Sequence, residues 1–388
     1  MKLSYLIYNA FGVGGTVRTV FNQANAMAEH GHDVEIATML RYHEEPPFLL
    51  DPRVKMIALV DNRTGPHSYV DWDGYEGQED TSWHTLLPLG VSKNADSRRR
   101  ISALIRYLQS LDDRIVIGTR PTINLVVAEF TDPSLTRIVQ EHAGLSTHKG
   151  EWREAIDTAY VKLDAVVCLT QGDRAAYTQA FPDLRVDLIP NALHTLDVPQ
   201  TDLSRPQIVS AGRLDENKGF DKLIEAFSQV SMTHPDWTLR IHGHGPALEG
   251  LRKLVRTKHL YNHVFLMGST KNLDAELAKG SIFAMSSRSE GFGMVLLEAM
   301  NCGLPVVSFN CPVGPRELIT DGVDGLLVPE RDVDALAAGI SRLIEDEELR
   351  GRLSQSALKK AAEYGPALVA RSWEQLYKEL ITAKRISP

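Results

Sequence analysis

The sequence predicts an α/β protein of two Rossmann-like domains, each with a parallel sheet between layers of helices. Short β-branched and aliphatic runs alternate with segments of helical periodicity over nearly the whole chain, a pattern typical of parallel sheets. The 388 residues exceed what one core normally fills. Residues 189–206 are rich in Pro, Asn and Asp and lack periodicity, as expected of an interdomain linker.

In the first half the apolar runs predict strands at 3–8, 34–38, 54–59, 115–119, 136–141, 165–170 and 186–190. The helix after the first of these strands has apolar residues at i, i+3, i+4 and i+7, and Gly31 stands where a left-handed residue ends a helix. Residues 61–90 break this series with Gly, Pro and clustered acidic residues. We expect a long loop there, of a length that often has a functional role.

The second half predicts strands within 207–212, 238–243, 264–268, 282–287, 305–309 and 325–329. We place the first domain at 1–195 and the second at 196–365, with the helix 366–386 after it.

Composition narrows the class of protein. Hydrophobic residues at 43% and charged residues at 24% are ordinary globular values. A net charge of -8 argues against nucleic acid as an obligatory partner. The three cysteines form no CxxC pair, which argues against a disulfide framework and a zinc site. No apolar run is long enough for a membrane helix, and the N-terminus does not resemble a signal peptide. We expect a cytoplasmic protein.

The loop 9–16, between the first strand and its helix, contains Gly12, Gly14 and Gly15. These glycines let a ligand approach the backbone, and the helix start behind them presents N–H groups to an anion. The dinucleotide fingerprint fails, because Val17 stands at its third glycine position and no acidic residue ends the second strand. The loop therefore indicates either close approach of a ligand or helix packing.

Two cations lie at the corresponding place in the second half. Arg213 and Lys218 follow the strand at 207–212 and precede a helix, and ligands in open α/β sheets bind at the carboxyl ends of strands. A guanidinium fork and an ammonium group suit a diphosphate there. A surface turn with two solvated cations explains the same spacing.

The segment 286–300 carries two carboxylates beside glycines. Glu290 follows a strand, Gly291 and Gly293 free the backbone, and we expect a helix to begin near Phe292. Glu298 lies eight residues after Glu290. The helix start can receive a phosphate, and the carboxylates can accept hydrogen bonds from sugar hydroxyls. Either glutamate by itself is explained equally well as a helix cap or a surface residue.

Two further patterns suggest metal sites, and we interpret both as incidental. Asp71-Trp72-Asp73 reads as a DxD motif but lies in the acidic loop, without a strand before it. His242 and His244 end a strand, but no third ligand lies within sequence reach.

A cluster of arginines lies on the helix expected after the long loop. Arg98, Arg99, Arg100 and Arg106 flank an apolar face. They form either a solvated face on a packed helix or a basic surface for an anionic polymer or a membrane.

The spacing of Glu290 and Glu298 resembles the E-x7-E motif of retaining glycosyltransferases of family 4, which have the GT-B fold. The segments AGRLDENKGFDKLIEAF, IHGHGPALEGL, EGFGMVLLEAMNCGLPVVSF and GPRELITDGVDGLLVP also resemble family segments, as do GGTVRTVFNQANAMAEHGHDVEIAT, LDAVVCLTQGD and IPNA in the first half. The resemblance thus covers nearly the whole chain. It implies two domains facing each other across a cleft, with the last helix packing back on the first domain.

The resemblance also implies a role for each matching residue. Arg213 and Lys218 would neutralise the donor diphosphate, Glu290 would hold the transferred sugar, and Glu298 would hold the ribose. His142 matches a histidine near the donor sugar in several members, although a structural histidine explains it as well. The other donor contacts implied are Gly14, Gly15, Gly243, Gly291, Phe292, Gly293, Met294 and Val295.

The function implied is transfer of a hexose, with retention, from a nucleotide diphosphate sugar to an acceptor hydroxyl, without a metal or other cofactor. UDP-glucose and UDP-N-acetylglucosamine are the expected donors, ahead of GDP-mannose. The acceptor expected is a cell-surface polymer or a small glycoside. A nucleotide-sugar epimerase or hydrolase on the same fold, or a sugar-binding protein without catalysis, are the alternatives.

Overall fold

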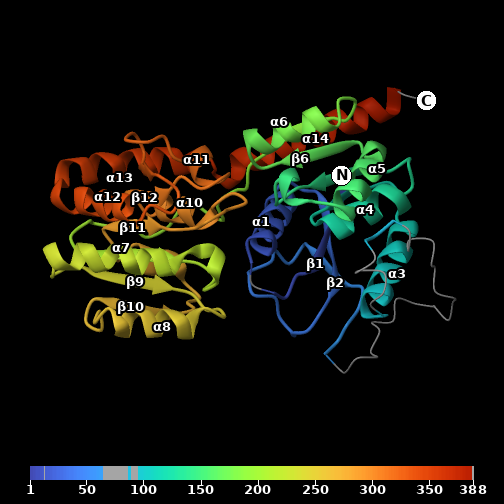
Figure 1. The fold of residues 1–388 in the computed structure, drawn as a ribbon. Coiled ribbons are helices and arrows are strands. Elements are labelled where there is room, and N and C mark those ends of the chain that lie inside the picture. The colour runs from blue at the N-terminus through green and yellow to red at the C-terminus, as the bar shows by residue number, and fades with distance from the viewer. Residues whose placement is uncertain (13, 64–85, 89–94, 387–388) are drawn as a thin grey trace. The chain divides into compact units, whose positions relative to one another are not determined.

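The computed structural model describes residues 1–12, 14–63, 86–88 and 95–386. The chain divides into two compact units, Met1–Ala192 together with Pro366–Pro388, and Leu193–Gly365 (Figure 1). The break after Ala192 falls inside the stretch 189–206 that the sequence marks as a linker. Each of the predicted strands has a counterpart within a few residues of its expected bounds.

The first unit contains a parallel sheet in the order β3-β2-β1-β4-β5-β6-β7. Its strands are β1 Lys2–Asn9, β2 Asp33–Leu40, β3 Lys55–Ala58, β4 Ile115–Gly118, β5 Thr136–Gln140, β6 Ala165–Cys168 and β7 Val186–Leu188. Its α-helices are α1 Gly15–Glu29, α3 Ala95–Gln109, α4 Pro121–Phe130, α5 Glu151–Ala159, α6 Gln171–Ala180 and α14 Pro366–Ile386.

Alternating side chains of this sheet face two separate cores. In β1, Tyr5 packs into a core with α1 and α14, whereas Leu6 packs into a core with α3, α4 and α5. Such alternation is the normal consequence of the strand repeat. Trp373 of α14 is fully buried, and the hydroxyls of Tyr5 and Tyr377 lie 3.1 Å apart. The last helix, red in Figure 1, therefore completes the core of the unit that begins the chain.

The second unit contains a parallel sheet in the order β10-β9-β8-β11-β12-β13. Its strands are β8 Gln207–Ala211, β9 Thr238–His242, β10 Val264–Gly268, β11 Ile282–Met285, β12 Val306–Phe309 and β13 Leu326–Val328. Its α-helices are α7 Phe220–Thr233, α8 Leu248–Thr257, α9 Leu273–Leu277, α10 Met294–Asn301, α11 Pro315–Leu318, α12 Val333–Glu345 and α13 Glu347–Ala362. One core joins this sheet to α7, α8 and α12, while α10 packs against β11, β12 and α13.

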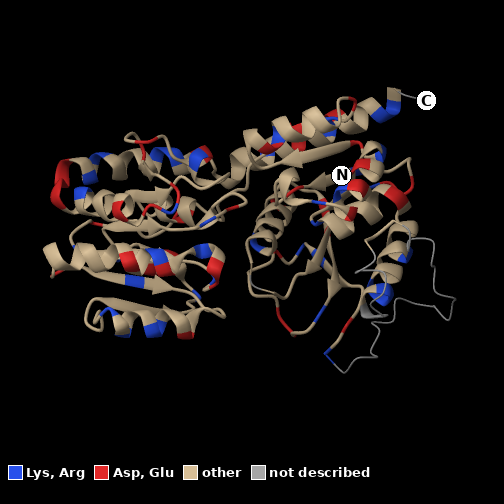
Figure 2. Ribbon diagram, in the orientation of Figure 1, with Lys and Arg blue, Asp and Glu red and all other residues tan. Residues whose placement is uncertain are grey.

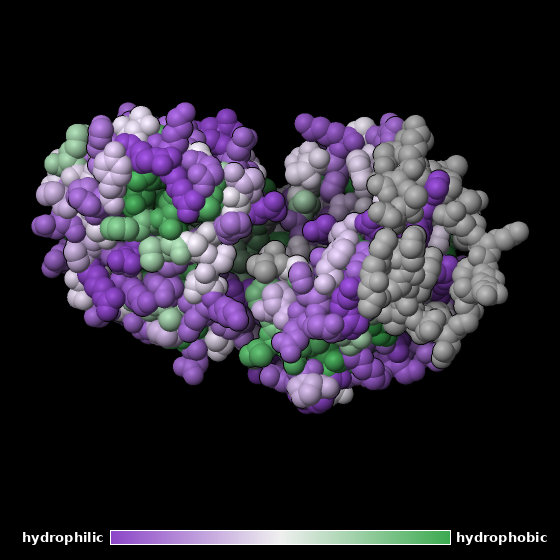
Figure 3. Space-filling model, turned by 90° about the horizontal axis from the view of Figure 1, so that it is seen from below, coloured by the Kyte–Doolittle hydropathy of each residue, from purple (hydrophilic) through white to green (hydrophobic). Residues whose placement is uncertain are grey.

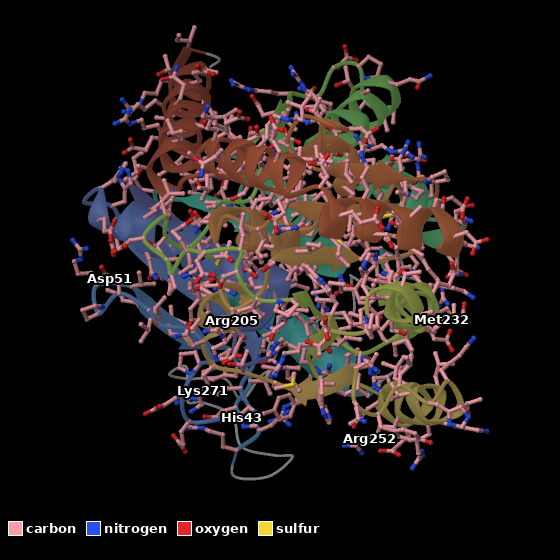
Figure 4. All side chains as sticks on the ribbon, turned by 90° about the vertical axis from the view of Figure 1, so that its left-hand side faces the viewer. His43, Asp51, Arg205, Met232, Arg252 and Lys271 are labelled. Atoms are coloured by element: carbon pink, nitrogen blue, oxygen red, sulfur yellow. The ribbon has the colours of Figure 1, made fainter. Side chains whose placement is uncertain are left out.

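The outer surfaces of the helices are polar, as amphipathic helices require. In α8, Leu251 and Val255 are buried, whereas Arg252 projects outward in Figure 4. Figure 2 shows basic and acidic residues interspersed over both units, and the face seen in Figure 3 is mainly hydrophilic, with hydrophobic residues in limited areas. Within the described residues, no helix combines the length and the apolar character needed to cross a membrane.

The arginines of α3 lie at the margin of the packed helix. Arg98, Arg99, Arg100 and Arg106 are all half-buried rather than fully solvated, and none of them lacks a partner. The guanidinium of Arg100 donates a hydrogen bond to the hydroxyl of Tyr8 and lies over its ring. Apolar residues bury the inner face of α3 as expected, Leu104 and Leu108 among them. These contacts bring the basic residues of this helix partly into the packing around the sheet, and their contact with an anionic polymer or a membrane stays a prediction.

Candidate active site

The second unit has a topological switch point between β8 and β11. From β8 the chain runs outward through β9 to β10, and the other strands lie on the opposite side, beginning with β11. The helices that follow β8 and β11 are α7 and α10, which lie on opposite faces of the sheet. The loops 212–219 and 286–293 therefore leave the carboxyl edge in opposite directions, which is where ligands bind in open α/β sheets.

Backbone and side-chain hydrogen bonds hold these two loops together. The amide of Arg288 donates to the carbonyl oxygen of Asn217 at 2.7 Å, and the side-chain amide of Asn217 donates to the carbonyl of Ser289 at 2.8 Å. The hydroxyl of Ser289 donates back to Oδ1 of Asn217 at 2.8 Å, and Nη2 of Arg288 lies 2.8 Å from Oδ2 of Asp221. Residues 67 to 72 positions apart are thereby fixed relative to one another.

Lys218 and Glu290 form the centre of the site. Lys218 ends a short 3₁₀-helix capped by Asp215, and its Nζ lies 2.6 Å from Oε1 of Glu290. The hydroxyl of Ser287 donates to the same Oε1 at 2.6 Å. The side chain of Glu290 is 8% exposed and that of Lys218 is 23% exposed. Within the described residues Oε2 of Glu290 makes no hydrogen bond, so it remains able to accept one from a ligand.

Arg213 is placed differently from Lys218. Its side chain is 73% exposed, and its Nε lies 3.6 Å from Oδ2 of Asp215. That separation is longer than a good hydrogen bond, and such an exposed pair contributes little to stability. The guanidinium therefore stands beyond the end of β8 without contacting Glu290, and can turn toward a ligand at little cost.

Glycines shape the rest of the edge. Gly243, directly after β9, has φ +149°, and a Cβ there would lie 1.9 Å from the carbonyl oxygen of Gly212. Gly293 has φ +95° and caps α10, which begins at Met294. The helix thus starts two residues later than expected, and Gly291, Phe292, Gly293, Met294 and Val295 span its approach and first turn. The free N–H groups of that turn provide a ready place for an anion.

Glu298 lies in the second turn of α10 and is 4% exposed. It is therefore neither a helix cap nor a surface residue, the two plain explanations that its sequence position allowed. Burial, and then the negative charges of Asp274 and Glu298, raise the pKa of the Cys302 thiol to about 12. Burial, and then the charge of Glu290, raise the pKa of the Cys311 thiol, after β12, to about 12 as well. Neither thiol is a nucleophile at neutral pH.

The remaining predicted residues belong to the first unit. Gly14 and Gly15 are exposed at the start of α1, where Gly14 is the N-cap residue. His142 follows β5, and its Nε2 is buried with no hydrogen-bond partner in the described part of the chain. Burial, and then the charge of Arg120, lower the pKa of His142 to about 4. The imidazole is consequently neutral at physiological pH.

The candidate metal ligands named from the sequence lie in different parts of the chain. Asp71 and Asp73 lie outside the described residues. His242 is buried at the end of β9, where burial lowers its pKa. Among the described residues, no three His, Cys, Asp or Glu side chains come together in a way that could hold a metal ion.

Sequence reasoning missed Ser287 and the frame formed by Asn217, Arg288 and Ser289. Ser287 stands three residues before Glu290 in the same loop, and this spacing was the only available signal. No periodicity applies to an irregular loop, so the curvature that brings Ser287 onto the carboxylate is visible only in three dimensions.

Comparison with known proteins now identifies the family. Residues 196–360 match the family model described as Glycosyl transferases group 1. The chain is 32% identical over 99% of its length to an exopolysaccharide phosphotransferase of Streptomyces coelicolor, but it spans only 41% of that protein. It is 30% identical over 97% of its length to the amylovoran biosynthesis glycosyltransferase AmsD of Erwinia amylovora, and covers 99% of it.

The architecture agrees with this match. A TarM mutant of S. aureus, solved with Fondaparinux, alpha-GlcNAc-glycerol and UDP, superimposes with a TM-score of 0.79 at 16% identity, covering 97% of this chain and 100% of that one. At such identity the likeness concerns the fold alone. With a relative of the same length at 30% identity and two Rossmann-like units, the chain belongs to the group 1 glycosyl transferases and has the GT-B fold.

Proposed function

We propose that this enzyme transfers a hexose from a UDP-sugar to a hydroxyl of a cell-surface glycan polymer, with retention of configuration and without a metal ion. The observation that carries the proposal is the Lys218–Glu290 pair at the switch point of the second unit, beside the N-terminus of α10. The named relatives are an exopolysaccharide phosphotransferase and an amylovoran biosynthesis glycosyltransferase, and the structural neighbour was solved with UDP. These likenesses favour a polymer acceptor and a uridine donor.

The geometry suggests how the pair acts on a donor. An ammonium group has three N–H donors, and Lys218 donates one of them to Oε1 of Glu290. A second N–H is available for a phosphate oxygen, while Oε2 of Glu290 accepts a hydrogen bond from a sugar hydroxyl. The pair can thus hold the two sides of the bond that breaks, and Ser287 fixes the orientation of the carboxylate.

The main catalytic task is to stabilise the leaving diphosphate. As the bond between the sugar and the phosphate lengthens, negative charge grows on the phosphate oxygens. Lys218, the exposed guanidinium of Arg213 and the N–H groups of α10 would meet that charge, and such preorganised donors are usually the largest catalytic contribution. These groups already supply the positive charge that a divalent ion would otherwise provide, so we expect turnover to persist in excess EDTA.

Glu290→Gln and Glu298→Gln test this site map, with Glu225→Gln on α7 as the control. If Glu298 contacts the ribose, its variant weakens free UDP by at least tenfold, since a charged hydrogen bond contributes about 1.5–3 kcal/mol. Glu290→Gln should leave free UDP binding within a few-fold and reduce donor turnover. Isothermal titration with UDP and GDP, followed by turnover assays, measures both. Loss of UDP binding in Glu290→Gln but not in Glu298→Gln would reverse the donor's orientation.

A donor panel tested with and without acceptor glycans separates the remaining alternatives. Turnover of UDP-glucose or UDP-N-acetylglucosamine only when acceptor is present supports transfer, whereas equal turnover without acceptor indicates a hydrolase or an epimerase. Binding without any turnover indicates a sugar-binding protein. Proton NMR of the first product from an α-linked donor reports the configuration, and a β-linked product would refute retention.

A further inference from the structure

The first unit has its own switch point, between β1 and β4. Tyr8 lies near the end of β1, and Arg120 follows β4 as the N-cap residue of α4. The hydroxyl of Thr119 donates to the carbonyl oxygen of Leu6 at 2.7 Å. That bond ties the end of β4 to β1, so it fixes where Arg120 emerges from the sheet.

Two guanidinium groups meet one aromatic ring at this point. The Cζ atom of Arg120 lies 5.4 Å from the ring centroid of Tyr8, and that of Arg100 lies 5.8 Å from the same centroid. Arg100 also donates to the Tyr8 hydroxyl. A cation over an aromatic face is stabilised, so the ring of Tyr8 helps to hold both guanidinium groups. The exposed charge of Arg120 would attract an anion bound beside them.

Other arginines near this edge of the sheet have carboxylate partners. Arg63 pairs with Asp61 at 2.6 Å, and Arg41 lies 3.7 Å from Glu44. Arg120 is exposed, and no carboxylate pairs with it among the described residues. It is therefore the cation here whose charge the described part of the chain leaves uncompensated.

Glu141 does not serve as the missing partner of Arg120. It is buried after β5 and accepts hydrogen bonds from the side-chain amide of Asn124, at 2.9 Å, and from the hydroxyl of Tyr160. His148 lies on its other oxygen at 3.9 Å. Those donors hold the carboxylate inside the unit.

Two more groups at this edge of the sheet could contact the same ligand. Nε2 of His142 is buried without a hydrogen bond in the described chain, and it is near enough for the charge of Arg120 to act on it. The first N–H groups of α4 also point along the helix axis toward this edge, with a proline at the first helical position. The backbone N–H groups donate to anionic oxygens, and Nε2 of His142 does so in the tautomer that carries its proton.

We propose that Tyr8, Arg100 and Arg120 bind an anionic group of the acceptor, a phosphate or a carboxylate, at the switch point of the first unit. This inference rests on the proposed function and names its acceptor class as a charged glycan. Arg120 supplies the uncompensated charge, Arg100 adds a second guanidinium, and Tyr8 holds both side chains in place.

The test uses the full chain saturated with UDP, so that phosphate-binding groups in the second unit are occupied. Isothermal titration compares a glycerol phosphate oligomer, a galacturonate oligomer and a neutral maltooligosaccharide of similar length. We expect one of the anionic oligomers to bind at least tenfold more tightly than the neutral one, and the one that binds identifies phosphate or carboxylate as the source. Equal affinity for all three oligomers, or no measurable binding of either anionic oligomer, would overturn the inference.

Arg120→Gln should weaken that binding at least tenfold, and Arg120→Lys, which keeps the charge but loses the planar fork, should lie between it and the wild type. Arg371→Gln on α14 is the matched control, because it removes one exposed arginine from the same unit. An equal loss in the control would mean nonspecific attraction and refute the site, as would unchanged binding by Arg120→Gln. UDP affinity, measured by the same titration, reports the donor site separately. Absence of UDP binding in the wild type would refute the proposed function instead.

Discussion

Replacing Lys218 by Met tests whether the pair with Glu290 is a structural unit of the empty enzyme. The substitution keeps much of the length of the side chain but removes the charge, leaving a carboxylate that is 8% exposed with Ser287 as its donor. Removing one partner of a charged hydrogen bond costs about 1.5–3 kcal/mol. Lys218 is 23% exposed, so water compensates part of this, and we expect a loss of about 1–2 kcal/mol in the free energy of unfolding.

The assay is urea unfolding at pH 7 without ligand, with Lys222→Met as the control. Lys222 pairs with Glu225 at 2.8 Å, but both side chains are about a third exposed, so its loss should cost no more than about 0.5 kcal/mol. The double variant Lys218→Met/Glu290→Gln removes both charges and should recover at least half of the stability lost. Equal losses at Lys218 and Lys222, or no recovery in the double variant, would refute the reasoning.

Three further outcomes follow from the same contacts. Gly243→Ala should lower the free energy of unfolding by at least about 2 kcal/mol, because its Cβ would overlap the neighbouring carbonyl oxygen. Gly250, exposed in α8 with open space around it, is the control, and Gly250→Ala should raise the free energy of unfolding by about 0.5–1 kcal/mol. The opposite order of stability in thermal melts would contradict this. Arg213→Ala should lower kcat/KM at least tenfold without changing urea unfolding, since its guanidinium is 73% exposed, and wild-type kinetics would place the diphosphate elsewhere. The folded-state pKa of His142 is lowered from 6.5 to about 4 by burial and then by Arg120, so the unfolded chain binds a proton in that window that the folded chain does not. The free energy of unfolding should therefore fall by about 1–2 kcal/mol as the pH is lowered from 7 to 5 because of His142. In urea titrations at several pH values, His142→Asn should lose this part of the pH dependence. A pH dependence in His142→Asn equal to that of the wild type would contradict the reasoning.

The sequence by itself determined the order of strands and helices and the family. Each strand leaves a local apolar run and each amphipathic helix leaves a 3.6-residue period, so the parallel α/β class was readable without coordinates. The glycine-rich turns and the residues 213, 218, 290 and 298 could be named as candidate ligand contacts, because a strand, a turn and a helix are contiguous in the chain.

The tertiary structure decided which of those residues meet. Lys218 and Glu290 are 72 positions apart, and Arg100 is 92 positions from Tyr8. These pairs form because crossover connections of a parallel sheet bring the ends of distant strands to one edge. Burial was equally invisible, since Glu298 and the arginines of α3 have ordinary surface positions in the sequence pattern. A periodic pattern records which face of an element is apolar, but only the packing of whole elements fixes which charges lie beside one another and which are left without a partner.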